Sequence, residues 1–179
     1  MRIAVCLFIS LSLVAAACGA EEVVGKRPYE MDWANRFQDD HPPLVDFENL
    51  DGWTVKTANS AASIVRTREQ QLWDKHVAKF TYRATGAGPT YVIVPPQPLK
   101  IAQPFDAVSL WVYGNNWSYA RDASTPMVSI TAQFLDAQGR AVNVPLTTVT
   151  WKEWHLCSRR LTPEQIAMVQ DGASFVGLD

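Results

Sequence analysis

Side chains that could bind a sugar gather in one short stretch. Residues 115–122 read Asn-Asn-Trp-Ser-Tyr-Ala-Arg-Asp. A sugar presents apolar C–H faces on which aromatic rings stack, and hydroxyls that bond to amide, carboxylate and guanidinium groups. The candidate ligand-binding residues are Asn115, Asn116, Trp117, Tyr119, Arg121 and Asp122, with Trp73 in a polar connection as a second stacking platform. The alternative is that Trp117 folds back onto the domain while the asparagines serve a turn, since Asn tolerates positive φ.

Catalytic chemistry has no comparable signal. The sequence lacks a Gly-x-Ser-x-Gly elbow and a Gly-rich phosphate loop, and its three histidines are not at metal-binding spacing. Glycoside hydrolysis needs two carboxylates across a cleft. The carboxylates at Asp39–Asp40 and at Asp46 with Glu48 are instead adjacent or share one predicted strand. We therefore predict that this chain is not an enzyme and uses no catalytic cofactor.

Composition and net charge indicate which classes of binding partner to expect. The 179 residues are 47% hydrophobic and 19% charged, as expected for a globular chain, and the net charge is -2. Binding to nucleic acid or to an anionic membrane surface requires a basic patch, which this balance does not favour. We therefore expect no nucleic-acid partner.

The N-terminus has the pattern of a signal peptide. Arg2 precedes an apolar run at 3–14 and small residues at 15–17, so residues 1–20 are predicted to be removed after export. The run is too short for a confident transmembrane helix. We expect a secreted, periplasmic or cell-surface protein without a transmembrane helix after cleavage.

A lipid anchor is the second interpretation of the same segment. Ala-Ala-Ala-Cys-Gly at 15–19 resembles a bacterial lipobox, in which Cys18 would carry the lipid, although Ala15 replaces the usual Leu. Beyond the leader Cys157 stands alone, so no intramolecular disulfide is expected.

The elements that must position the candidate loop are predicted to be strands. The strongest pattern is 105–113, where Val108 and Leu110 alternate with Ser109 and Trp111. Both faces are apolar or aromatic, which indicates a central strand with Trp111 in the core and 127–135 as its partner. Trp151 and Trp154 are also predicted to be core residues.

The rest of the chain reads as strands and turns. Residues 21–43 form a polar, extended lead-in, the domain spans 44–179, and residues 98–104 are a proline-rich loop. Thr162, Pro163 and Gln165 mark the start of a short helix with a capping box. The remaining predicted strands are 44–48, 53–56, 62–67, 77–85, 91–94, 141–144, 151–156 and 173–178.

Many short strands with one helix near the C-terminus predict an all-β, two-sheet sandwich or jelly roll. The final strand begins at Ala173 and is followed by no turn or polar tail. This pattern predicts that the sandwich lacks its last strand and that the sequence is an N-terminal fragment with a downstream domain.

Several short motifs resemble the galactose-binding-like jelly rolls, which include the carbohydrate-binding modules of bacterial glycoside hydrolases. They are Val-Asp-Phe-Glu at 45–48 with Asp-Gly-Trp at 51–53, the strand 105–114, Trp-Lys-Glu-Trp at 151–154 and the helix start Leu-Thr-Pro-Glu-Gln at 161–165. The resemblance covers residues 44–179. It implies an exported accessory domain and a structural calcium near the first and last strands, with Asp46 and Glu48 as candidate ligands. The alternative is that both carboxylates face solvent at a sheet edge.

These observations predict a non-catalytic carbohydrate-binding or accessory module at the N-terminus of an exported protein. Members of this family differ in function, and several bind no known sugar. The alternative is therefore a spacer domain without a ligand, attached to a downstream glycoside hydrolase.

Overall fold

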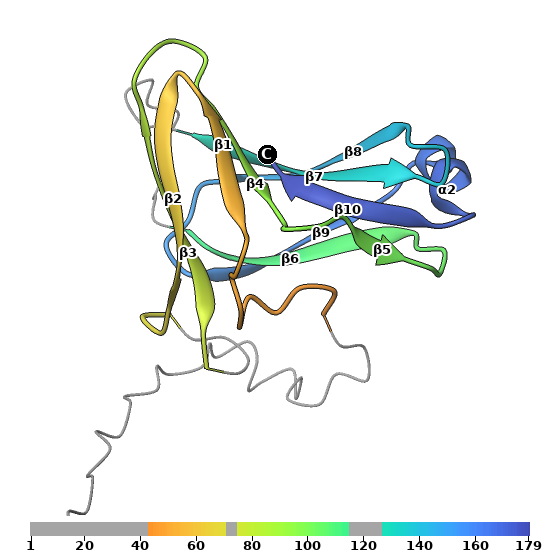
Figure 1. The fold of residues 1–179 in the computed structure, drawn as a ribbon, viewed down its shortest axis with the longest axis horizontal. Coiled ribbons are helices and arrows are strands. Elements are labelled where there is room, and N and C mark those ends of the chain that lie inside the picture. Colours follow the sequence, from red (N-terminus) through yellow and green to blue (C-terminus); the bar gives the residue numbers. More distant parts are fainter. Residues whose placement is uncertain (1–42, 71–74, 115–126) are drawn as a thin grey trace, which may run out of the picture.

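Antiparallel β-strands dominate the fold (Figure 1). The computed structural model describes residues 43–70, 75–114 and 127–179. The strands are β1 (Thr54–Ala58), β2 (Ser60–Thr67), β3 (Val77–Ala84), β4 (Thr90–Val94), β5 (Leu99–Ile101), β6 (Ala107–Tyr113), β7 (Val128–Asp136), β8 (Ala141–Val149), β9 (Trp154–Arg160) and β10 (Ala173–Leu178), with one helix among these residues, α2 (Pro163–Val169). The predicted all-β class with a short helix near the C-terminus is confirmed.

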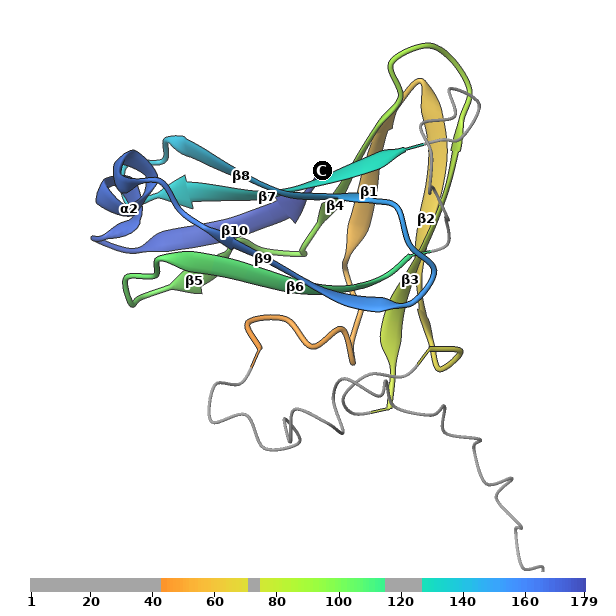
Figure 2. The ribbon, with the colours of Figure 1, turned by 180° about the vertical axis from the view of Figure 1, so that it is seen from behind.

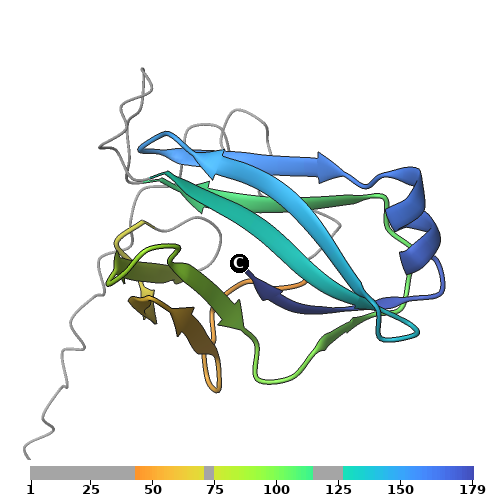
Figure 3. The same cartoon turned by 90° about the horizontal axis from the view of Figure 1, so that it is seen from above.

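The strands form one six-stranded sheet and two pairs. The main sheet has the order β1–β4–β10–β7–β8, with β5 also bonded to β10, while β2 pairs with β3 and β6 with β9. A single residue pair, Ile93–Leu178, joins β4 to β10. Beyond this joint β1 and β4 run across the direction of β7, β8 and β10, with the β2–β3 pair beside them (Figures 1 and 2). Viewed from above, β6 and β9 run alongside β7 and β8, and α2 lies at one end (Figure 3).

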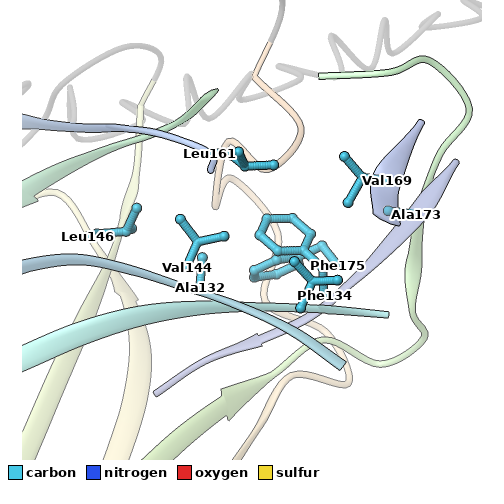
Figure 4. Packing of buried hydrophobic residues seen from close by; sticks show 9 residues of the cluster. Ala132, Phe134, Val144, Leu146, Leu161, Val169, Ala173 and Phe175 are labelled. Carbon is cyan, nitrogen blue, oxygen red and sulfur yellow. The ribbon is translucent and has the colours of Figure 1, made fainter. Parts of the chain in front are cut away.

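The fully buried core lies on one side of the main sheet (Figure 4). Alternation along β7 and β8 sends every second side chain inward, and β10 and α2 complete the cluster. Phe134 is 3% exposed, and its ring contacts those of Phe105 and Phe175. The buried members are Ala132, Phe134, Val142, Val144, Leu146, Leu161, Val169, Ala173 and Phe175.

Two local sequence signals are confirmed. The Thr162 side chain accepts from the Gln165 backbone N–H and the Gln165 side chain accepts from the Thr162 N–H, which completes the predicted capping box of α2. The predicted turn at 136–139 joins β7 to β8. There Asp136 accepts from the backbone N–H groups of Gln138 and Arg140 and from Arg140 Nε at 2.6 Å.

The predicted strand 44–48 is wrong. Asp46 Oδ1 accepts from the Glu48 N–H at 3.0 Å, which is a local turn, and Phe47 has a φ of 61°. A bulky residue rarely adopts this left-handed conformation. The Phe47 ring packs against Trp53 at a centroid distance of 5.4 Å. Phe47 makes this contact from a left-handed backbone rather than from a regular strand.

The predicted partner of β6 is also wrong. β6 pairs with β9, whereas β7 pairs with β8 and β10. Val108 and Leu110 pack against the core, so alternation places Trp111, which is half-buried, on the opposite face. Trp111 is therefore not a member of the core cluster.

Other strand boundaries differ from the prediction. The proline-rich loop 98–104 contains β5, which pairs with β10. β8 continues through Pro145 to Val149, because an edge strand tolerates a residue without an N–H donor. β9 begins at Trp154 rather than Trp151.

The final strand occupies the interior of the main sheet. β10 is bonded to β4 and β5 on one side and to β7 on the other. A β-bulge between Phe175 and Gly177 shifts its register against β7. Residues 173–178 are thus not a sheet edge, while the expected additional strand remains a prediction.

Candidate functional site: the aromatic end of the β6–β9 pair

All seven predicted sugar-binding residues lie outside the described residues. Six fall within 115–126, and Trp73 falls within 71–74. The structure does describe the two ends from which the 115–126 segment departs, namely Gly114 after β6 and Met127 before β7. The described residues next to Gly114 therefore form the base of the candidate site.

The face of the β6–β9 pair that points away from the core carries the base of the site. Three cross-strand pairs occupy this face: Ser109–Ser158, Trp111–Leu156 and Tyr113–Trp154. The first pair is polar, with 2.9 Å between the two hydroxyl oxygens. The other two are apolar or aromatic, so the aromatic character increases toward Gly114.

Tyr113 and Trp154 form the exposed end of this face. Their ring centroids are 5.6 Å apart, and the rings meet edge to face at 74°. Tyr113 is 40% exposed, whereas Trp154 is half-buried. Trp154 Nε1 is shielded from solvent and has no hydrogen-bond partner among the described residues. Trp154 thus supports the pair, and Tyr113 presents its ring to solvent.

Gly114, which follows β6, lies against the turn that precedes β9. Its N–H donates to the Glu153 carbonyl at 3.2 Å, and a side chain at this position would collide with the Trp151 carbonyl. Trp151 Nε1 donates to the Val112 carbonyl at 3.2 Å, and its ring lies 4.9 Å from that of His155. The turn before β9 therefore clamps the end of β6.

Glu48 serves as an internal anchor. Its carboxylate accepts from the backbone N–H groups of Lys75 and His76 at 2.6 and 2.7 Å, and its Oε2 lies 2.8 Å from His76 Nδ1. Burial opposes ionisation, but these donors outweigh it, so the pKa of Glu48 lies below its ordinary value. The Glu48 carbonyl also accepts from Arg66 at 3.1 Å. Together these contacts tie the segment before β1 to β2 and to the start of β3.

This arrangement does not fit a calcium ion. Calcium takes six to eight oxygen ligands. Both oxygens of Glu48 already face nitrogen groups of the chain, and Asp46 Oδ1 accepts from the Glu48 N–H. Over the described ranges, no three His, Cys, Asp or Glu side chains come together as a metal site would require.

A shallow hollow of about 220 Å³ lies on the outer face of the main sheet. The bulge in β10 places Val176 there, and Gly177 lies where a side chain would press on the Ile93 carbonyl. The lining residues are Lys56, Val92, Val94, Pro95, Pro98, Gln133 and Val176. The lining contains no aromatic ring, so the hollow lacks the stacking surface that a sugar site requires.

The structure adds Tyr113 and Trp154, two residues outside the predicted set, to the candidate site. The sequence predicts Tyr113 as part of the scaffold strand and Trp154 as a core residue, whereas Tyr113 is exposed and Trp154 is half-buried outside the core cluster. Alternation alone puts Tyr113 and Trp111 on one face, but pairing Tyr113 with Trp154 requires the register of two strands 41 residues apart in sequence (154 minus 113). That register is a long-range property which no local motif encodes.

No protein-family model, curated protein or solved structure matches this chain. Within the described ranges, none of the helical structure is both long enough and apolar enough to cross a membrane.

Proposed function

We propose that this chain is a non-catalytic carbohydrate-binding module of an exported protein, built on a galactose-binding-like jelly roll. The observation that carries the proposal is the exposed Tyr113 ring, held edge to face on Trp154 where β6 ends. Sugar recognition needs a fixed aromatic face with polar groups nearby. Residues 115–122, which directly follow Gly114, supply asparagine, arginine and aspartate in sequence.

The clamp at Gly114 supports the same proposal. A stacking ring contributes more to affinity when its position is fixed before the ligand arrives, because less conformational entropy is then lost. Tyr113 is the last residue of β6, and the Gly114–Glu153 and Trp151–Val112 hydrogen bonds hold the strand at that point.

The test is affinity electrophoresis on a panel of soluble plant and bacterial polysaccharides. We expect at least one polysaccharide to retard the wild-type chain. Tyr113→Ala and Trp117→Ala should each weaken the affinity for that polysaccharide about tenfold or more. Loss of one stacking aromatic typically costs on the order of 1–3 kcal/mol. Val65→Ala is the matched control, because Val65 is 50% exposed but lies on β2.

The outcome separates binding from a purely spacing role. A wild-type chain that no polysaccharide retards contradicts sugar binding and favours the spacer domain. Retardation that both substitutions leave undiminished would place the sugar elsewhere on the molecule.

We also propose that the module is exported by its N-terminal leader and precedes a further domain, such as a glycoside hydrolase. The charge pattern of residues 1–20 supports export, and the family resemblance supports the accessory role. The mass of the mature N-terminus distinguishes ordinary cleavage from a lipid anchor on Cys18. The gene sequence downstream of Asp179 tests the further domain, and a stop codon there would contradict it.

A further inference from the structure

A second aromatic cluster lies on β3 and β4, strands that do not pair with β6 or β9. Phe80, Tyr82 and Tyr91 form it, with ring centroids 5.2 to 5.8 Å apart. Phe80 and Tyr82 stack at 25°, and Tyr91 meets Phe80 edge to face at 81°. The cluster belongs to the end of the fold where β1 to β4 run across the other strands (Figures 1 and 2).

This cluster is packed less tightly than the core. All three of its rings are half-buried, whereas Phe134 and Phe175 are 3% and 6% exposed. The strand neighbours opposite the tyrosines are small, with Ala62 opposite Tyr82 and Thr57 opposite Tyr91. The rings therefore remain accessible beside short side chains.

The two tyrosine hydroxyls are available to a ligand. In the described part of the chain, neither the Tyr82 nor the Tyr91 hydroxyl has a hydrogen-bond partner, and neither is among the polar atoms shielded from solvent without one. Tyrosine hydroxyls that serve only packing usually find a partner when buried. Burial and the neighbouring Tyr91 raise the pKa of Tyr82, so its phenol keeps its proton at neutral pH.

The surroundings favour a neutral ligand. Alternation along β3 places the aromatic side chains on one face and Lys79, Thr81 and Arg83 on the other. β3 thus directs its formal charges away from the rings. Arg66 of β2 shares the ring face, but its guanidinium donates to the Glu48 carbonyl at 3.1 Å. The rings offer apolar surface and two hydroxyls. A neutral polyhydroxylated ring matches both properties, because its C–H face stacks and its hydroxyls exchange hydrogen bonds.

We propose that Tyr82 and Tyr91, supported by Phe80, form a second sugar-binding site distinct from the one at Tyr113. One ring stacks on the sugar, and the two phenol hydroxyls bond to its hydroxyls. The choice of ligand class rests on the proposed function.

The test removes the two phenol hydroxyls and follows the response of both sites in the same titration. The probes are hexasaccharides of glucose, xylose and galactose, titrated by NMR into chain carrying labelled tyrosine and phenylalanine rings, so that Phe80 reports on this site when both tyrosines are replaced. We expect the Tyr82 and Tyr91 signals to shift in the wild type, and Tyr82→Phe/Tyr91→Phe to lose about tenfold in affinity at this site while the Tyr113 signal responds as before. Phenylalanine preserves the packing, and unchanged thermal unfolding confirms that the fold is intact.

Three other results would contradict the second site, its hydroxyl contacts, or the proposed function as well. If Tyr113 shifts while Tyr82 and Tyr91 do not, the second site is wrong and the proposed function stands. If Tyr82 and Tyr91 shift but Tyr82→Phe/Tyr91→Phe binds as tightly as wild type, the assigned hydroxyl contacts are wrong. If no tyrosine responds to any hexasaccharide, both the second site and the proposed function fail.

Discussion

At the scale of single residues, the chain uses its carboxylates to hold itself together. Glu48 accepts from two backbone N–H groups and lies against His76 Nδ1, and Asp136 closes the β7–β8 hairpin through Arg140. Carboxylates paired in this way stabilise the fold while they are ionised. The acid stability of the domain is therefore set in part by two local networks.

The Glu48 network gives a pH prediction. The pKa of Glu48 is lowered from its ordinary 4.5, so its contribution is fully present above about pH 4.5 and is lost as the pH falls through the lower folded value. We expect the difference in unfolding free energy between wild type and Glu48→Gln to shrink as the pH falls from 7 to 3, measured by urea denaturation.

The comparison with Glu48→Gln isolates this residue, since Asp136 titrates in both proteins. Glu69→Gln is the control, because the Glu69–Lys79 ion pair joins side chains that are 64% and 47% exposed and should contribute little. A wild-type advantage that stays constant down to pH 3 would argue against Glu48 as an ionised anchor.

At the scale of elements, features set by neighbouring residues are predictable from the sequence, whereas features set by long-range strand pairing are not. The capping box at Thr162 and the turn at Asp136 are complete within a few residues, so the sequence predicts both. Trp111 could not be placed from alternation, which says that two faces differ but not which one meets the core. Phe47 escaped prediction because its left-handed backbone depends on Trp53 and on the anchoring of Glu48 to His76.

The end of β6 gives the prediction at this scale. Gly114→Ala would drive a methyl group into the Trp151 carbonyl, so the clamp must open. We expect a loss of about 2–4 kcal/mol in unfolding free energy, by urea denaturation, together with weaker polysaccharide retardation.

Gly139→Ala is the control for that substitution. Gly139 has open space around it but a φ of 78°, so it carries backbone strain without a collision. We expect it to cost about 1 kcal/mol and to leave retardation unchanged. Equal losses of unfolding free energy for the two substitutions would show that the collision with the Trp151 carbonyl adds nothing to the cost of Gly114→Ala.

At the scale of the whole molecule, burial is unevenly distributed. No residue of β1 to β4 is fully buried, whereas β7, β8 and β10 supply most of the core. The two regions meet in the main sheet through the Ile93–Leu178 pair. The region of β1 to β4, which carries the Phe80, Tyr82 and Tyr91 rings, is thus the less buried of the two.

This difference predicts a gradient of local stability. Elements with few buried contacts open at lower free energy than the global unfolding transition. We expect amide hydrogen exchange to be slowest in β7 and β10 and clearly faster in β2 and β3, measured by mass spectrometry of peptic peptides at neutral pH. Equal protection throughout would indicate that the two regions unfold as one unit.

The interior position of β10 also bears on how the chain is made. Residues 173–178 join β4 to β7, so every earlier strand of the main sheet must be synthesised before the two halves can be connected. Until then β4 and β7 each present an unpaired edge, and such edges pair readily with other chains. The nascent protein therefore carries a high risk of misassociation until β10 emerges.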